Sequence, residues 1–471
     1  MNVIIMGLGH FGGGIGAARW YASQGHHVII TDQQPAEKLA DSVAQLRDFA
    51  VEYSLGSHDE RLLDRCDLLI VSPAVDKQRS AFFQSAVKRG VSWTTEINEF
   101  CRQCPAPIVG VTGSAGKSTT ASMIFASLVR LMGADRCHLG GNIGQSLLPR
   151  LPIIRSDHLV VLELSSFMLE DLPLIQFSPH VAVVTNLVNN HLDRHRTMEA
   201  YAAAKINILR FQKPRDAAVL NRNDAHVNQW GRYTSGRVIY FDSARLNLQA
   251  PGSHNQINAA AALAAVEALG FSNSLSAAIE ALEQFESLPH RMESVGMSKN
   301  YRGENVTWIN DSKATTPEST LTAVNAVPRG QAVVIVGGAD KQADMSTLAQ
   351  SLVRLSWGII TIGSTGPQIA AAIKHFLAED GRMVDRQAAP RLFEANTLAE
   401  AVKRAHCWIT EPPSISLGVE IAAPSCVLLS PACASYDQFD NYEHRGAVFR
   451  ELVTQINSSW PAVQAKSSQP G

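Results

Sequence analysis

The chain has 471 residues, of which 45% are hydrophobic and 18% are charged, and its formal net charge at pH 7 is −2. A chain of this length holds roughly two to four domains, each with a core of its own. The near-neutral balance provides no basic surplus for binding nucleic acid or an anionic membrane.

The chain carries no sign of export or of a disulfide framework. Met1 leads directly into an apolar run without the charged start of a signal peptide, and no apolar stretch reaches the roughly 18 residues of a membrane span. The seven cysteines are odd in number and scattered, and Cys101 and Cys104 have no second pair at zinc spacing. We therefore expect a cytoplasmic protein with no membrane or nucleic-acid partner.

The first hundred residues alternate between strand-like and helix-like patterns. An apolar run at 2–6 leads into three glycines spaced G-x-G-x-x-G, which end at Gly12, and a helical pattern follows at 15–23. Asp32 lies 20 residues beyond the last glycine, after a second apolar run at 27–30. This arrangement is typical of dinucleotide-binding folds, in which the acid accepts hydrogen bonds from ribose hydroxyls. Taken alone it predicts NAD, although another diphosphate, or close helix packing, satisfies the same glycines.

The first domain is predicted to end near residue 104. An apolar run at 67–71 indicates another buried strand, and residues 90–100 form the last part of the domain. The segment 101–107 contains two prolines and is predicted to be a linker.

The stretch at 107–119 organises the second domain. Its apolar start breaks into small residues and glycine, and a helical pattern follows at 121–132. This order predicts a strand, a loop and a helix, with phosphate bound by the loop backbone and the helix N-terminus. Lys117 would meet the β- and γ-phosphates, and the Ser118 hydroxyl would hold Mg²⁺. Val111 occupies the place of the first glycine of the full motif, so the shorter G-x-x-G-K-S-T remains.

Two polar positions follow in this domain. Asn142 lies in a glycine-rich loop at 140–144, and Glu163 ends an apolar run that starts at residue 159. A glutamate in such a place is costly unless it is paired or bound to metal, and a Mg²⁺-associated carboxylate belongs there in phosphoryl-transfer folds. For Asn142, turn formation is the alternative interpretation.

Later segments of the domain are less specific. His191 follows a strand-like run at 181–184 and is either a metal ligand or a solvated loop histidine. Lys205 lies on a helix predicted to begin near residue 198 and is interpreted, from the sequence alone, as a surface lysine. Asn255 and Asn258 share one face of an alanine-rich helix, where they contact a ligand or cap the helix start.

A third α/β segment follows Arg291. Strands are predicted at 308–310, 332–336, 358–362 and 425–429. Asp311 and Lys313 follow the first of these, and Lys341 follows a glycine turn after the second. The small residues at 430–439 expose backbone N–H groups at a helix start, which suits a carboxylate. Residues beyond about 458 are predicted to form a polar tail.

Together, these motifs resemble the Mur ligase family, and within it the branch that adds D-glutamate. The matching stretches occur in the family's order over nearly the whole chain: Gly113 to Thr119, Gly140 to Gly144, Glu163 to Phe167, His191 to Arg194, His254 to Asn258, Pro289 to Arg291, Asn310 to Thr315 and Ser430 to Phe439. The resemblance implies an α/β fold of three domains. These are a Rossmann-like domain at 1–104 that binds the UDP substrate, a central P-loop ATPase domain with a mostly parallel sheet at 105–288, and a Rossmann-like domain at 289–471 that binds the amino acid and ATP.

The resemblance also implies an ATP-dependent amide synthesis in peptidoglycan precursor assembly. ATP would phosphorylate the terminal carboxylate of UDP-N-acetylmuramoyl-L-alanine, and the amine of D-glutamate would then attack the acyl phosphate through a tetrahedral intermediate. Phosphorylation is needed because a carboxylate cannot lose oxide to an amine. The family relationship implies two Mg²⁺ ions, and we expect a monomer.

Carried over residue by residue, the resemblance implies a role for each motif. The implied ATP-binding residues are Gly113, Ser114, Ala115, Gly116, Lys117, Ser118, Thr119, Asn255, Asn258, Arg291 and Asp311. The implied substrate-binding residues are Gly9, Asp32, Asn142, Lys313, Thr315, Lys341, Ser435, Tyr436 and Tyr442. The implied catalytic residues are Lys117, Glu163, His191 and Lys205. Ser118 and Glu163 would hold one Mg²⁺ and His191 a second, supported by Lys205 as a carbamate. The first domain would bind UDP in place of NAD, with Asp32 near the uridine end.

Some positions depart from the family pattern. Asn189 and Asn190 precede His191 where an acidic residue is expected, and Thr315 begins a Thr-Thr-Pro stretch where Asn and a small residue are common. Tyr436 and Tyr442 stand where Leu and Phe are expected near the glutamate pocket, which leaves the identity and chirality of the added amino acid open.

Three alternative functions stay open. One is another amide ligase of the same superfamily, such as a folylpolyglutamate-type enzyme, which the Rossmann-like segment before the phosphate loop disfavours. The Asp-Asn-Pro-Arg motif of the lysine- or diaminopimelate-adding relatives is missing. The others are a nicotinamide-dependent oxidoreductase fused to an NTPase, and a nucleotide-binding regulator without catalysis.

Overall fold

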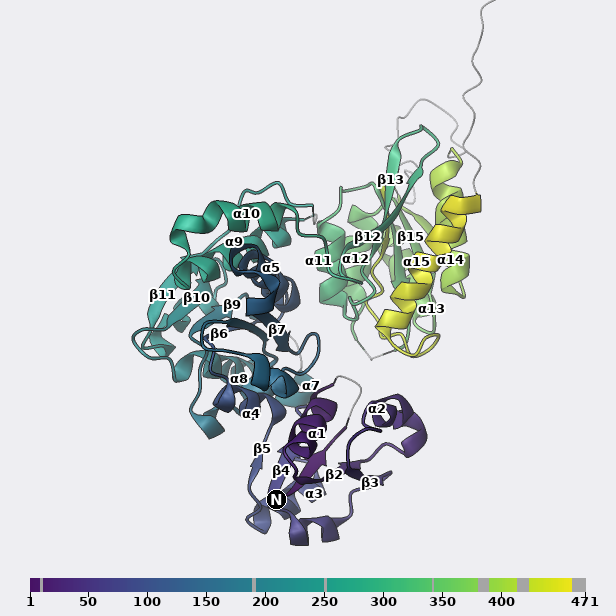
Figure 1. Ribbon diagram of the computed structural model, residues 1–471. Helices are drawn as coiled ribbons and strands as arrows, with labels where there is room; N and C mark the ends of the chain where they lie inside the picture. The colour runs from purple at the N-terminus through teal and green to yellow at the C-terminus, as the bar shows by residue number, and fades with distance from the viewer. Residues whose placement is uncertain are drawn as a thin grey trace, which may run out of the picture. The chain divides into compact units, whose positions relative to one another are not determined.

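The structure is a computed structural model that describes residues 1–8, 12–188, 192–249, 252–340, 343–379, 389–412 and 423–459 (Figure 1). The chain divides into two compact units. One consists of Met1–Asn247 with Gln256–Phe285, and the other of Leu248–Asn255 with Glu286–Gly471. Within the described ranges, no helix is both long enough and apolar enough to cross a membrane.

The first unit begins with a parallel sheet of strand order β3-β2-β1-β4-β5. Its strands are β1 (Asn2–Met6), β2 (His27–Asp32), β3 (Val51–Leu55), β4 (Leu68–Val71) and β5 (Trp93–Thr94), and its helices are α1 (Gly13–Ser23), α2 (Ala40–Ala44), α3 (Ala81–Lys88) and α4 (Glu96–Gln103). The strands and the first helix predicted in this region are confirmed, because each buries the apolar run from which it was predicted.

Helix α4 differs from the sequence-based prediction. Residues up to Gln103 are helical, so the segment predicted as a linker starts inside a helix. The reason is the apolar spacing of Ile97, Phe100 and Cys101, which places three side chains on one buried face. The Thr95 hydroxyl accepts a hydrogen bond from the Asn98 amide and caps the helix start.

The same unit contains a second parallel sheet, of strand order β11-β10-β9-β6-β8-β7. Its strands are β6 (Ile108–Thr112), β7 (Cys137–Gly141), β8 (Leu159–Glu163), β9 (Val181–Val184), β10 (Ala217–Asn221) and β11 (Arg237–Phe241). The helices of this region are α5 (Lys117–Met132), α6 (Ser166–Leu169), α7 (Leu192–His195), α8 (Met198–Arg210), α9 (Ser253–Ala268) and α10 (Leu275–Glu283). Because all the pairs are parallel, the loops after β6, β8, β7 and β9 lie at one edge of the sheet.

A continuous hydrophobic core joins the two sheets of this unit. It includes Ile5 and Ile30 of the first sheet, Phe100 of α4 and Val160 of β8. The two parts therefore pack as one body, and the site at the edge of the second sheet has the first sheet as a fixed neighbour.

The second unit is built on one mixed sheet of strand order β12-β13-β17-β14-β15-β16, in which only the pair β12–β13 is antiparallel among the described pairings. Its strands are β12 (Glu293–Lys299), β13 (Asn305–Asn310), β14 (Ala332–Gly337), β15 (Gly358–Ile362), β16 (Arg391–Glu394) and β17 (Cys426–Leu429). Its helices are α11 (Pro317–Asn325), α12 (Ser346–Leu355), α13 (Gly366–Glu379), α14 (Leu398–Thr410) and α15 (Tyr442–Ser459).

Two separate cores cover the two faces of this sheet. Helices α11, α12 and α13 pack on one face, and α14 and α15 pack on the other (Figure 1). The α/β fold predicted from the sequence is confirmed in both units. The polar tail predicted beyond residue 458 lies outside the described residues from residue 460 onward.

Candidate active site

A glycine loop, residues 113–116, connects β6 to α5. Gly116 has a φ of 80°, in the left-handed region where glycine is favoured. A Cβ on Gly116 would lie 2.5 Å from the Asn258 side-chain oxygen, so no larger residue fits without displacing that side chain. The β-branched strand before the loop and the helix after it are as predicted.

Two residues after β9 hold the loop in place. The Asn186 side-chain oxygen accepts from the Ala115 amide at 2.9 Å, and its amide nitrogen donates to the Ala115 carbonyl at 3.0 Å. The Thr185 hydroxyl donates to the same carbonyl at 2.7 Å. Sequence reasoning missed both residues, and the only signal was their place at the end of a buried strand.

The start of α5 is arranged for an anion. Gly116 is the N-cap residue, and within the described chain its helix start has no side-chain cap. The Lys117 ammonium group donates to the Ser114 carbonyl at 3.1 Å, which keeps it beside the loop. The positive end of the helix and the lysine therefore act at the same place, as phosphate oxygens require.

An oxygen-rich group lies next to the lysine. The Ser118 hydroxyl and the Glu163 carboxylate are 2.5 Å apart, and the Asn142 amide donates to the other Glu163 oxygen at 2.9 Å. Glu163 is only 1% exposed. A carboxylate and a hydroxyl are oxygen donors, which Mg²⁺ prefers, and this ion usually takes its remaining ligands from water and substrate phosphates, so the two residues fit that ion.

Lys205 corrects the prediction from the sequence alone. It is 1% exposed, so the surface-lysine interpretation is wrong. The reason is that α8 turns this side chain inward, where its ammonium nitrogen donates to the Gly113 carbonyl at 2.8 Å and lies 4.6 Å from the centre of the Tyr201 ring. Burial lowers the pKa of Lys205 well below its ordinary value, and the nearby positive charge of Lys117 acts in the same direction.

The two asparagines of helix α9 are both buried. The Asn258 side-chain oxygen accepts a hydrogen bond from the Thr120 hydroxyl at 3.2 Å, so it lies beside the first turn of α5. The structure therefore brings together Lys117, Ser118, Glu163, Asn142, Lys205 and Asn258 around the glycine loop.

The first sheet of this unit carries a separate cavity of about 480 Å³. Its lining includes Gly7, Asp32, His58 and Ser72. Gly7 and Asp32 belong to the predicted nucleotide-binding motif, so the cavity lies at that motif. The Asp32 carboxylate accepts from the backbone amides of Leu8 at 2.8 Å and Gln34 at 2.9 Å. Asp32 thus shapes the glycine turn, besides facing the cavity where a ribose is predicted.

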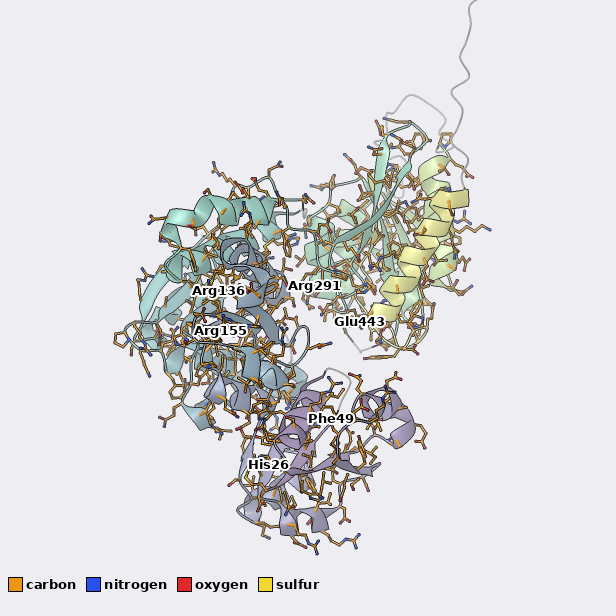
Figure 2. All side chains as sticks on the ribbon, in the orientation of Figure 1. His26, Phe49, Arg136, Arg155, Arg291 and Glu443 are labelled. Atoms are coloured by element: carbon orange, nitrogen blue, oxygen red, sulfur yellow. The ribbon has the colours of Figure 1, made fainter. Side chains whose placement is uncertain are left out.

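In the second unit, Asp311 follows β13 and is buried. Its two oxygens accept from the Met292 amide at 3.2 Å and from the Ser430 hydroxyl at 2.9 Å. Burial raises the pKa of Asp311 to about 7, while these hydrogen bonds and the positive charge of Arg291 oppose the shift. Arg291 (Figure 2) and Asp311 are therefore neighbours, as their shared predicted role requires.

The residues predicted near the incoming amino acid lie in the loops after β13 and β17. The Lys313 ammonium nitrogen is 4.9 Å from the centre of the Tyr442 ring, and the Thr315 amide donates to the Lys313 carbonyl at 2.9 Å. Ser435 is buried, whereas Tyr436 is 75% exposed. Gly9, His191 and Lys341 lie outside the described residues.

Sequence reasoning missed Arg445, which holds these loops together. Its side chain is 1% exposed and donates to the Ser312 carbonyl at 2.8 Å and to the carbonyls of Cys433 and Ala434 at 3.1 Å. Burial lowers the pKa of Arg445 to about 10. No local motif marks it, because its partners are carbonyl groups of two separate loops, one of which is 133 residues away in the sequence.

Fold and site together define a class of protein. A parallel sheet presents a lysine, a hydroxyl and a carboxylate to a glycine loop at a helix start, which is the arrangement of phosphoryl-transfer enzymes. Comparison with known families agrees with this class. The Mur ligase middle domain matches residues 111–245, and the Mur ligase MurD-like, N-terminal domain matches residues 1–94.

Curated relatives cover almost the whole chain. A UDP-N-acetylmuramoylalanine–D-glutamate ligase of Symbiobacterium thermophilum is 35% identical over 470 residues, with 93% of this chain and 95% of the relative aligned. One from Roseiflexus sp. is 33% identical, with 96% of this chain and 98% of the relative aligned. The chain belongs to the Mur ligase family.

Solved structures share the fold at lower identity. The MurF ligase of Thermotoga maritima in complex with ADP aligns with a TM-score of 0.56 and 16% identity over 91% of this chain and 96% of its own. A pseudomurein peptide ligase type C of Methanothermus fervidus gives a TM-score of 0.54 and 16% identity over 97% and 99%.

Proposed function

We propose that this chain is the ATP-dependent ligase that adds D-glutamate to UDP-N-acetylmuramoyl-L-alanine in peptidoglycan precursor synthesis. The observation that carries the proposal is the meeting of Lys117, Ser118, Glu163 and Lys205 at the glycine loop, in a chain whose full-length relatives bear the name of that ligase.

The first step joins two anions. The glycine loop, the start of α5 and Lys117 bind the triphosphate, and Lys117 draws negative charge from the γ-phosphate as the substrate carboxylate attacks it. Ser118 and Glu163 would hold Mg²⁺, which when bound neutralises charge on the phosphate oxygens. The carboxylate becomes an acyl phosphate, ADP leaves, and the amine of D-glutamate then displaces phosphate and forms the amide.

Lys205 is suited to carbamylation. A neutral amine is needed to attack CO₂, and burial next to Lys117 favours the neutral form of Lys205. The reaction forms a C–N bond and releases one proton, which leaves an anion beside the Gly113 carbonyl. His191 and this carbamate would hold a second Mg²⁺.

The other predicted residues complete the proposal. Asn255, Asn258, Arg291 and Asp311 contact ATP. Asp32 lies near the uridine end of the substrate, Gly9 contacts the same substrate, and Asn142 contacts its muramoyl part. Lys341, Ser435, Lys313, Thr315, Tyr436 and Tyr442 receive the amino acid. The proposed domains are 1–104, 105–288 and 289–471. We propose a cytoplasmic monomer, and the seven free thiols support a reducing compartment.

The test is phosphate release from ATP, with the product identified by mass spectrometry. We expect release that requires both UDP-N-acetylmuramoyl-L-alanine and D-glutamate, with L-glutamate as the control for chirality. Release without either substrate, or turnover that requires a different amino acid, would contradict the proposal.

A further inference from the structure

The cavity of the first sheet has one rim formed by a single loop. The rim segment, residues 72–77, connects β4 to α3, and Ser72, Ala74, Val75 and Asp76 line the cavity. It packs closely on the glycine turn, because a Cβ on Gly7 would lie 2.9 Å from the Ser72 Cβ. Its position therefore sets the shape of the cavity on this side.

Arg194, from α7 near the other sheet, holds this rim. Its guanidinium group donates to three consecutive carbonyls: those of Ala74 at 3.0 Å, Pro73 at 3.2 Å and Val75 at 2.5 Å. The guanidinium carbon lies 4.7 Å from the centre of the Phe167 ring, and this contact restrains the orientation of the planar guanidinium group. A lysine has no planar fork and cannot reproduce this set of bonds.

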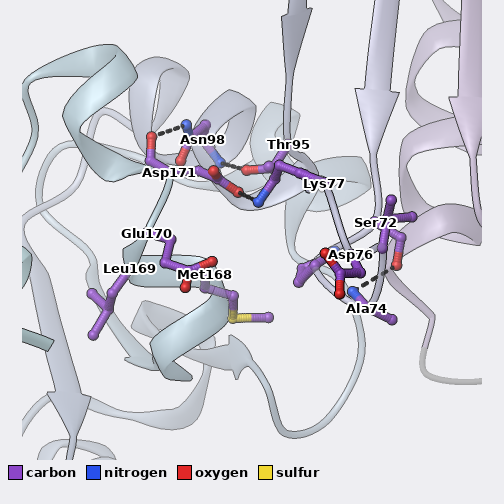
Figure 3. Close-up of polar contacts among 12 residues, drawn as sticks. Ser72, Ala74, Asp76, Lys77, Thr95, Asn98, Met168, Leu169, Glu170 and Asp171 are labelled. Atoms are coloured by element: carbon purple, nitrogen blue, oxygen red, sulfur yellow. Dashed lines mark hydrogen bonds and ion pairs between the residues drawn. The ribbon is translucent and has the colours of Figure 1, made fainter. Parts of the chain in front are cut away.

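A second contact connects the rim segment to the region of the chain that follows β8. The Lys77 ammonium group and the Asp171 carboxylate are 2.9 Å apart and mostly buried, and the Asn98 side-chain amide donates to the Asp171 backbone carbonyl at 2.7 Å (Figure 3). The rim is thus attached at both ends to the part of the unit that follows β8.

The backbone that carries Arg194 is held in place by its neighbour His195. The two ring nitrogens of the adjacent His195 have separate partners. Nε2 lies 2.9 Å from the Ser166 hydroxyl oxygen, and Nδ1 lies 3.2 Å from a Glu170 carboxylate oxygen. Ser166 begins the helix that follows Glu163, so the backbone of α7 is fixed to the strand that carries the candidate metal ligand.

We infer that Arg194 is a positioning residue that fixes the rim of the uridine cavity at a set place relative to the glycine loop. The inference rests on the proposed function. The substrate must be held at its uridine end and at its carboxylate together, so a loose rim weakens binding and misplaces the reacting carboxylate. In the proposed function ATP binds at the glycine loop of the second sheet, which does not include the rim segment.

The test compares Arg194→Ala and Arg194→Lys with the surface control Arg130→Ala, which removes an exposed ion pair with Glu280. We expect Arg194→Ala to raise the KM of the UDP-linked substrate about tenfold or more and to lower kcat, the effect of losing charge-assisted hydrogen bonds. The KM of ATP should stay within about twofold, and Arg194→Lys should lie between. Circular dichroism checks the fold of each variant.

Calorimetry with UDP alone separates this inference from the proposed function. We expect UDP to bind the wild-type protein at least about tenfold more tightly than Arg194→Ala, whatever reaction the enzyme catalyses. Equal UDP affinities, an unchanged KM for the UDP-linked substrate, or a parallel rise in the KM of both substrates would overturn the inference. A wild-type protein that binds UDP but forms no amide would contradict only the proposed function.

Discussion

Asp311→Asn should make the protein more stable and less active. The folded carboxyl group has a pKa of about 7, against an ordinary value of 3.8, with burial as the main cause. Between these two pH values the unfolded chain has released the proton and the folded chain retains it. Unfolding therefore becomes easier as the pH rises from about 4 to 7, and the full cost is present above 7.

The magnitude follows from this difference in pKa. It corresponds to about 4 kcal/mol of lost stability at pH 8. Asparagine has no proton to release, and its side-chain oxygen still accepts from the Met292 backbone amide. Its hydrogen bonds are weaker than those of the carboxylate, which costs about 1 kcal/mol of stability. The variant should thus gain about 3 kcal/mol at pH 8, or about 6–12 °C in the unfolding temperature of the second unit.

The assay is thermal unfolding of the ligand-free protein at pH 5 and pH 8, with Asp344→Asn as an exposed control in the same unit. The gain should be much smaller at pH 5 than at pH 8, and the control should show none. We also expect the KM of ATP to rise about tenfold, since a charged acceptor is lost. A stability difference that is the same at both pH values would refute the reasoning.

The remaining predictions concern the glycine loop and its lysines. Lys117→Ala should lower kcat at least about a hundredfold, because charge on the γ-phosphate is no longer neutralised; the exposed Lys213→Ala is the control, and normal turnover in the first variant would exclude the loop from the mechanism. Lys205→Ala should be inactive and regain part of its activity in acetate, whose carboxylate replaces a carbamate, as measured by phosphate release; failure of acetate to restore any activity would count against the carbamate. Gly116→Ala should weaken ATP binding about tenfold or more, because its Cβ meets the Asn258 side chain, whereas Gly25→Ala has a similar φ, with nothing within 4 Å, and should only lower the unfolding temperature slightly. Equal ATP affinity of the two glycine variants, by calorimetry, would show that the contact with Asn258 is unimportant.

Sequence patterns predicted those parts of the site that are local. The strand, glycine loop and helix around Lys117 are contiguous in the chain, and Glu163 ends its own apolar run, so the motif and its context were readable together. The same holds for Asp32, which follows the glycine turn at a familiar spacing.

The parts of the structure that depend on tertiary packing could not be predicted from the sequence. Lys205 has the pattern of a surface residue, and only the way α8 packs against β6 buries it. Asn186 and Arg445 form hydrogen bonds to backbone groups of other segments. Every residue type has these backbone groups, so the sequence does not show which segments provide them. Helix α4 extends past the predicted boundary because its buried apolar face packs against helix α1 and against the segments 148–153 and 172–175, which are distant in the sequence.

The central claim is that ATP activates the substrate carboxylate as an acyl phosphate. Its most direct test uses UDP-N-acetylmuramoyl-L-alanine labelled with ¹⁸O in both oxygens of the alanine carboxylate, with the released phosphate analysed by mass spectrometry. We predict that each phosphate carries one ¹⁸O atom, because the oxygen that attacks the γ-phosphate leaves with it when the amide forms. Unlabelled phosphate released together with the amide product would contradict the account.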